Sequence, residues 1–213
     1  MLADVLVYLL IPAAATFLGG IVAVYWAPGA QLRSALQHLA AGVVFAAVAG
    51  ELLPEIMHEG TALPVILGFT AGIALMLGIK WLAERGKMAS FGAQGGLVAI
   101  IGVDIAIDGL LVGVSFSAGA KAGILVTVAL SLEVLFLALS TAATQISGGA
   151  SRTRVLATAI GFAIALLGAA AAGAASLSSL SPSMLEAVLS FGVAALLYLV
   201  TEELLVEAHE QPE

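Results

Sequence analysis

The chain has 213 residues, of which 62% are hydrophobic and only 10% are charged, and its formal net charge is −7. A soluble globular domain carries about 25% charged residues, so this composition excludes an ordinary soluble fold. The acidic balance argues against a nucleic-acid partner, and the absence of cysteine excludes disulfides and thiolate metal sites.

Seven hydrophobic segments follow one another along the chain, and each is long enough to cross a ~30 Å hydrocarbon core as an α-helix. They cover residues 4–26, 34–57, 61–83, 95–119, 122–145, 154–176 and 184–207. The first segment begins without a basic region and lacks a cleavage site, so we expect a true span and not a signal peptide. No segment between the spans is long enough for a second domain. The sequence therefore predicts an all-α membrane protein, embedded in the lipid bilayer, with residues 1–213 in a single transmembrane domain.

Lys and Arg are distributed unequally between the two sides of this arrangement. With seven spans, one side carries Arg33, Lys80, Arg85, Lys87, Arg152 and Arg154, and the other carries only Lys121. Cytoplasmic loops of membrane proteins are rich in Lys and Arg, so we expect the first side to face the cytoplasm. The prediction is a multi-pass protein of the cytoplasmic (inner) membrane, with its N-terminus outside and its C-terminus inside.

A similar acidic sequence ends the second and the seventh span. It reads "ELLPEIMHE" at 51–59 and "ELLVEAHE" at 203–210. The two spans cross the membrane in opposite directions, and similar sequences in opposed orientation indicate an inverted repeat, which is common in secondary transporters. The alternative is that helix ends are simply acidic and that Leu-Glu pairs are frequent.

The acids and imidazoles of these two stretches are candidate ligands for a cation at the two mouths of a pathway. The candidates are Glu51, Glu55, His58, Glu202, Glu203, Glu207 and His209. Negative side chains near a helix C-terminus are unfavourable, because the helix dipole is negative there. Their presence at both mouths therefore favours cation handling over a role in stability. We interpret His38, at the start of the second span, as an interfacial residue.

The fourth and fifth spans carry acidic residues near their centres. Asp104 and Asp108 are four residues apart and share one helix face, and Glu133 lies at nearly the same depth in the next span. Each carboxylate costs on the order of 2.5–3.5 kcal/mol at the centre of a membrane helix. No Lys or Arg lies in the middle of any span. We therefore interpret the three acids as a midplane site that binds a divalent cation as substrate.

Other interpretations of these acids stay open. They could be protonated and hydrogen-bonded between helices as structural contacts, or they could serve a proton relay or a proton-coupled carrier of an organic substrate. Hydroxyl groups near them could add oxygen ligands or bond to the backbone; these belong to Ser115, Thr127, Ser131 and Ser140. There is no nucleophile–base pair or cofactor motif, so an enzyme is not expected.

The sequence resembles the ZIP family of divalent-metal transporters along nearly its whole length. The resemblance is carried by residues 38–55, by residues 196–210 and by "DIAIDGLLVGVSF" at 104–116, which is similar to the family's His-Asn-x-Pro-Glu-Gly signature. It implies a ZIP-like bundle in which spans 1–3 and 6–7 are inverted copies around a central pair, spans 4 and 5. It also implies inward passage of a metal ion such as zinc, manganese or iron.

Several residues depart from the family's pattern. Asp104 and Asp108 stand where the family has His and Glu, and Glu133 stands at the His position of the fifth span's motif. The sixth span carries no acid, and the family's eighth span has no counterpart. The resemblance thus implies one His-free metal site in place of a paired centre, and oxygen ligands favour hard ions such as Mn²⁺ or Mg²⁺. The alternative function is a non-transporting sensor or scaffold. The identity of the metal, the choice between channel and carrier, and the formation of a homodimer are left open.

Overall fold

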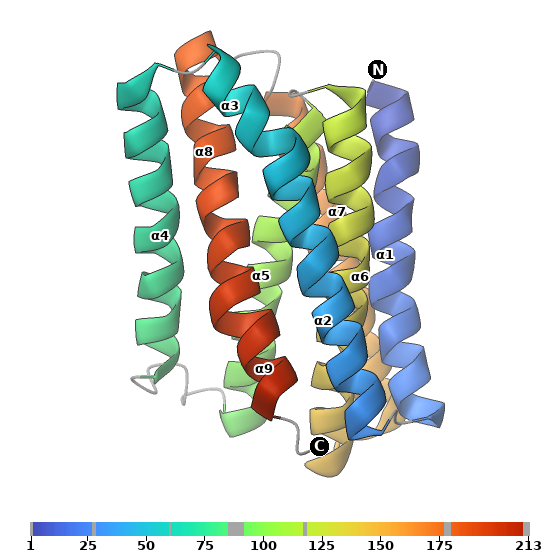
Figure 1. Cartoon of the computed structure of the whole chain (residues 1–213). Coiled ribbons are helices and arrows are strands. Elements are labelled where there is room, and N and C mark those ends of the chain that lie inside the picture. Colours follow the sequence, from blue (N-terminus) through green and yellow to red (C-terminus); the bar gives the residue numbers. More distant parts are fainter. Residues whose placement is uncertain are drawn as a thin grey trace.

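The computed structural model describes residues 2–26, 29–59, 61–84, 92–116, 119–176 and 180–210. Within these ranges the regular structure is helical and contains no β-strand. Among the described residues, seven helical segments are long and apolar enough to cross a membrane. This confirms the predicted all-α membrane class. Figure 1 shows the helices side by side in one bundle, in which α1 begins at one end and α9 ends at the other.

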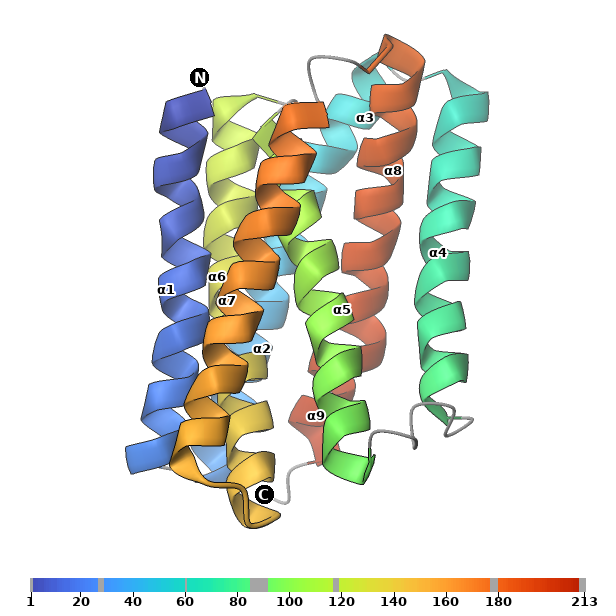
Figure 2. The same ribbon diagram turned by 180° about the vertical axis from the view of Figure 1, so that it is seen from behind.

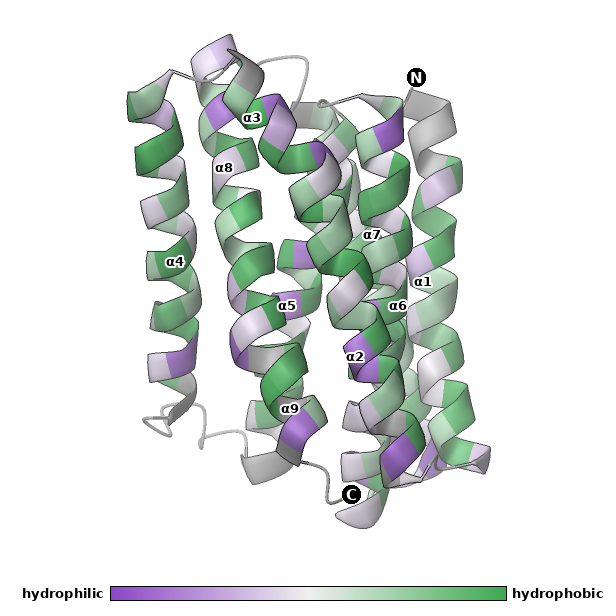
Figure 3. Ribbon diagram, viewed as in Figure 1, coloured by the Kyte–Doolittle hydropathy of each residue, from purple (hydrophilic) through white to green (hydrophobic). Residues whose placement is uncertain are grey.

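Each predicted span corresponds to one helix or, for the second and seventh spans, to a run of three. In chain order the elements are α1 (Leu2–Tyr25), α2 (Ala30–Ala47), η1 (Val48–Leu52), α3 (Leu53–Glu59), α4 (Ala62–Glu84), α5 (Gly92–Ser115), α6 (Ala120–Ser147), α7 (Arg152–Ser176), α8 (Pro182–Leu199), η5 (Val200–Leu204) and α9 (Leu205–Glu210). An α-helix forms its backbone hydrogen bonds within itself, so it is stable in hydrocarbon, which offers no hydrogen-bond partners. Figure 3 shows that hydrophobic residues make up most of the bundle.

Helix α6 lies at the centre of the packing. It contacts α1, α2, α5 and α7. In the most hydrophobic stretch of α6, 67% of the residues are buried, whereas the corresponding share for α4 is 17%. Helix α4 packs mainly on α8 and stands at the edge of the bundle in Figures 1 and 2. The helix that carries Glu133 is therefore the best shielded from lipid.

Spans two and seven have the same construction. Each consists of an 18-residue α-helix, a five-residue π-helix and a short α-helix. The π-helices η1 and η5 both begin with a buried Val and end with a buried Leu. Figure 1 shows α3 at one end of the bundle and α9 at the opposite end. These matching runs have the opposed orientation that the predicted inverted repeat requires.

The pairing of helices follows the same correspondence. Helix α1 packs most extensively on α6, and α7 packs most extensively on α5. These helices, α1, α5, α6 and α7, are the first, fourth, fifth and sixth spans. An inverted repeat exchanges the first span with the sixth and the fourth with the fifth, so it makes the contact of α1 with α6 equivalent to that of α7 with α5. The repeat therefore extends from the acidic sequences to the packing of the central helices.

The contact between α5 and α7 depends on glycine. A methyl group added at Gly109 would overlap with the carbonyl oxygen of Leu166, and one added at Gly113 would overlap with that of Ala170. Small residues at such positions let two membrane helices approach closely. Gly109, which follows Asp108, and Gly113, about one turn further along, thus allow α5 to lie close against α7.

Gly113→Ala is expected to destabilise the protein by about 1–3 kcal/mol, because an extra methyl group in a packed contact pushes the helices apart. Gly161→Ala is the matched control, since a methyl group there would meet nothing within 4 Å. Ala favours a helix over Gly by about 1 kcal/mol, so the control should be neutral or stabilising. Thermal unfolding in detergent measures both variants, and equal shifts would contradict the close contact.

Candidate metal site

Three carboxylates from two helices converge inside the bundle. Asp104 and Asp108 belong to α5, and Glu133 belongs to α6. Their exposed fractions are 8%, 2% and 1%, respectively. The three side chains offer one carboxylate oxygen each, and these oxygens all lie within 4.8 Å of one another. The structure therefore brings together the three residues that the sequence predicted as a site.

The neighbours of these acids along both helices are apolar. Ile105 follows Asp104 on α5, and Leu130 and Val134 flank Glu133 on α6; all three are fully buried. Charges interact strongly in such surroundings, because little water is present to screen them. Three carboxylates held this close repel one another unless protons or a cation reduce their charge.

The spacing of the three oxygens suits a single divalent ion. Carboxylate oxygens bind Zn²⁺ at about 2.0–2.2 Å and Ca²⁺ at about 2.3–2.6 Å. Three oxygens spaced evenly in a plane around one such ion are therefore about 3.5–4.5 Å apart. The three oxygens of the site lie within 4.8 Å of one another, which is close to this separation. One divalent cation and one proton would then balance three carboxylates.

Three of the four hydroxyl groups that were predicted near the acids bond to their own helices. Ser115 Oγ donates to the carbonyl of Val112 at 2.8 Å. Thr127 Oγ1 donates to that of Gly123 at 2.6 Å, and Ser131 Oγ to that of Thr127 at 2.5 Å. Of the two roles predicted for these hydroxyls, the structure shows the bond to the backbone.

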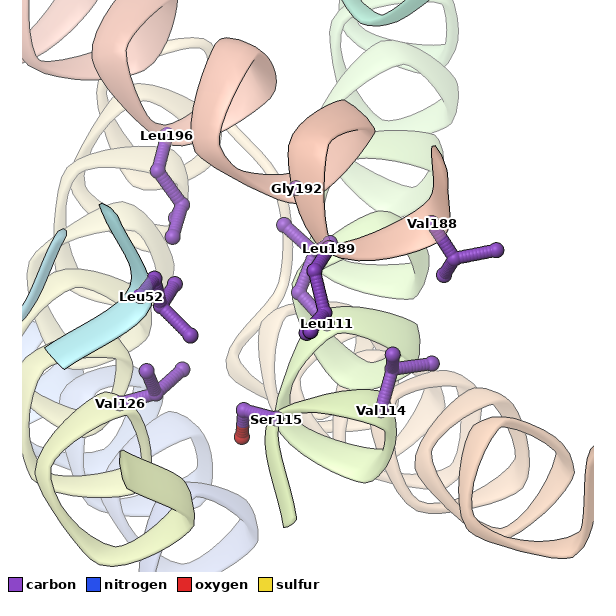
Figure 4. Close-up of a pocket in the computed structure, with 9 residues that line it drawn as sticks. All are labelled: Leu52, Leu111, Val114, Ser115, Val126, Val188, Leu189, Gly192 and Leu196. Carbon is purple, nitrogen blue, oxygen red and sulfur yellow. The ribbon is translucent and has the colours of Figure 1, made fainter. Parts of the chain in front are cut away.

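The packing between the site and the end of the bundle that carries α3 is apolar. A cavity of about 10 Å³ lies there. Figure 4 shows the residues that line it, which are Leu52, Leu111, Val114, Ser115, Val126, Val188, Leu189, Gly192 and Leu196. A cavity of this size holds about one water molecule, and Ser115 carries its only polar lining side chain. A hydrated ion does not fit in a cavity of this size.

Two of the acids predicted for the mouths form ion pairs with lysine. Lys121 Nζ lies 2.6 Å from Glu51 Oε1, and Lys80 Nζ lies 3.0 Å from Glu202 Oε2. Glu51 belongs to η1 and Glu202 to η5, so one pair lies toward each end of the bundle. The sequence reasoning missed both pairs. The available signal was that Lys121 is the only basic residue on its predicted side.

The remaining candidates are spread over the two ends. Glu55 is exposed on α3, and His209 is exposed on α9, where its ring contacts that of His38. The side chains of His58, Glu203 and Glu207 lie outside the described residues, as do Arg85 and Lys87, which contributed to the predicted orientation. Among the described residues, the central three form the only group of at least three acids or imidazoles close enough to hold a metal ion.

No protein-family model matches this sequence, and no curated protein matches it either. The resemblance to ZIP transporters therefore depends on the motifs quoted above. The function has to be inferred from the chemistry of the site and from the architecture of the bundle.

Proposed function

We propose that this chain is a ZIP-like transporter of divalent metal ions, in which the ion passes through the site formed by Asp104, Asp108 and Glu133. The observation that carries the proposal is the convergence of three buried carboxylates from two membrane-spanning helices. The sequence places no Lys or Arg in the middle of any span. A cytoplasmic membrane and inward transport follow from the resemblance and from the distribution of basic residues.

A purely structural role accounts less well for three acids at one depth. Replacing buried charged groups with apolar side chains of similar size is often neutral or stabilising. Acids in the middle of a membrane are costly and usually mark ion or proton pathways. Binding a divalent ion gives these groups a state in which their charge is balanced, and release of the ion with uptake of protons gives a second such state.

The two π-helices are suited to be the moving segments of this transporter. Single-turn π-helices interrupt the regular hydrogen bonding of an α-helix and occur frequently at functional sites. In η1, Glu51 pairs with Lys121, and the next residue, Leu52, lines the small apolar cavity. We infer that a shift of η1 opens the site toward one side of the membrane, and that a shift of η5 opens it toward the other.

Glu51 and Lys121 provide a test with effects of opposite sign. If the Glu51 carboxylate attracts the incoming ion, Lys121 competes with that ion. Lys121→Ala should lower the metal concentration for half-maximal uptake about threefold at low ionic strength, whereas Glu51→Gln should raise it by a similar factor. Changes in the same direction would show that the pair acts only by holding the helices together.

Uptake into proteoliposomes tests the proposed function itself. Purified protein should accumulate at least one of Mn²⁺, Zn²⁺, Fe²⁺ or Cd²⁺ inside the vesicles, with protein-free vesicles and Mg²⁺ as comparisons. Metal binding without any accumulation would instead identify a sensor or scaffold.

A further inference from the structure

Two arginines and two aromatic side chains meet where α1 ends and α7 begins. Arg152 and Arg154 lie in the first turn of α7, Tyr25 is the last residue of α1, and Trp26 follows it. All four side chains are exposed. The guanidinium carbon of Arg152 lies 5.8 Å from the centre of the Tyr25 ring, within the range of a cation–π contact. Figure 2 shows this end of α1 beside the start of α7, and we call these four residues the α1–α7 corner.

A small buried cluster holds the α1–α7 corner in place. It joins α1, α6 and α7 through Ala23, Leu139, Ala142 and Val155. Deeper in the bundle the two outer helices touch, since a methyl group added at Gly20 would lie 2.5 Å from the Cβ of Ala159. Ala23 comes just before Tyr25, and Val155 comes directly after Arg154. The exposed side chains of the corner are therefore presented from a packed framework.

The α1–α7 corner is positively charged, and the surrounding sequence supplies no acid to compensate it. Residues 5–50 contain one basic residue, Arg33, and no Asp or Glu. Residues 134–185 contain Arg152 and Arg154 and again no acid. These two ranges include the end of α1, the start of α2, the end of α6 and the start of α7. A purely basic region in a chain whose net charge is −7 favours an anionic partner.

The position of the corner favours a lipid as this partner. The distribution of basic residues predicts that this end of the bundle faces the cytoplasm, where the leaflet contains anionic lipids and basic residues near the membrane surface attract their headgroups. Trp and Tyr are typical of the headgroup level. Exposed apolar side chains follow on the same two helices toward the middle of the membrane, at Leu18, Ile160 and Ile164. They offer a surface for acyl chains, which a free phosphate ion would not use.

We propose that the α1–α7 corner binds the headgroup of an anionic phospholipid such as phosphatidylglycerol. The guanidinium groups of Arg152 and Arg154 contact the phosphate, because Arg matches its oxygens with paired hydrogen bonds. The positive end of the α7 dipole adds to this attraction. The ring of Tyr25 keeps the Arg152 side chain at the junction of the two helices. This lipid site is independent of the central carboxylates and of metal transport.

Tryptophan fluorescence in vesicles tests the proposal at the site itself. The chain has two tryptophans, so Trp81→Phe leaves Trp26 as the only reporter. Brominated lipids quench a tryptophan that they contact, and brominated phosphatidylglycerol is compared with brominated phosphatidylcholine. Each arginine should strengthen binding of the anionic lipid about fivefold. We expect phosphatidylglycerol to be preferred about 25-fold at Trp26, Arg152→Gln or Arg154→Gln to reduce this to about fivefold, and the double variant to show almost no preference.

Lys121→Gln is the matched control, because it removes a positive charge from the opposite end of α6 and should leave the preference at Trp26 unchanged. Equal quenching by brominated phosphatidylcholine in all variants would verify that they insert into the bilayer in the same way. Equal quenching of the Trp81→Phe protein by the two lipids, or an unchanged preference in the double arginine variant, would overturn the lipid site. Loss of the preference in excess inorganic phosphate would identify a site for free phosphate and would also overturn it.

Discussion

Asp108→Asn is expected to reduce the initial rate of metal uptake at least about 100-fold while the protein remains folded. The substitution keeps the shape of the side chain and removes its charge and one anionic ligand. Losing a group that only orients a metal ligand costs about 10–100-fold in affinity, so losing a ligand itself should cost at least the upper end of that range. The measurement is uptake of Mn²⁺ or Zn²⁺ into proteoliposomes that contain equal amounts of wild-type and variant protein.

Glu186→Gln is the control for this experiment. Glu186 is near the start of α8, where its carboxylate accepts hydrogen bonds from the backbone N–H and the hydroxyl of Thr61. The control neutralises an acid outside the central site and should transport at close to the wild-type rate. Wild-type uptake by Asp108→Asn would remove this residue from the transport pathway.

Glu133→Gln is expected to abolish the stabilisation of the protein by metal. An ion that binds only the folded state stabilises it by about 2.7 kcal/mol when its concentration is 100 times the dissociation constant. The variant lacks a buried anionic ligand and should lose most of this effect. Without metal it should be at least as stable as the wild type, because one of three mutually repelling carboxylates has become neutral.

Thermal unfolding in detergent, with and without Mn²⁺, measures both parts of this prediction. The order of the two proteins should reverse: the metal-free variant unfolds at or above the temperature of the wild type, and the metal-loaded variant unfolds below it. A variant that is less stable than the wild type without metal, and equally stabilised by Mn²⁺, would show that Glu133 has a structural role.

The spans could be predicted from the sequence because length and hydropathy determine which segments cross a bilayer. The π-helices that interrupt two of these spans could not be predicted from the sequence. Residues 184–207 were predicted as one span, yet the structure has a π-helix at Val200–Leu204. Gly50 in η1 and Glu202 in η5 occupy equivalent positions, so no single residue type marks the change of helix. The repeated Glu-Leu-Leu was the only visible sign.

The central site could be predicted because helical spacing places Asp104 and Asp108 on one face, and because Glu133 falls at a similar depth on the adjacent helix. The contacts at the two ends depend on how distant segments pack. Lys121 meets Glu51 only when α6 lies against η1, and His38 meets His209 only when α2 lies against α9. The sequence therefore indicated an interfacial role for His38 and gave no indication of its partner.

Anomalous X-ray scattering from crystals grown with Mn²⁺ tests most directly whether the three buried carboxylates hold one divalent ion. We expect a single strong peak between α5 and α6, with an oxygen of Asp104, Asp108 and Glu133 each within about 2.0–2.6 Å of it. An ion bound elsewhere in the bundle, with these three side chains directed away from it and from one another, would contradict the account.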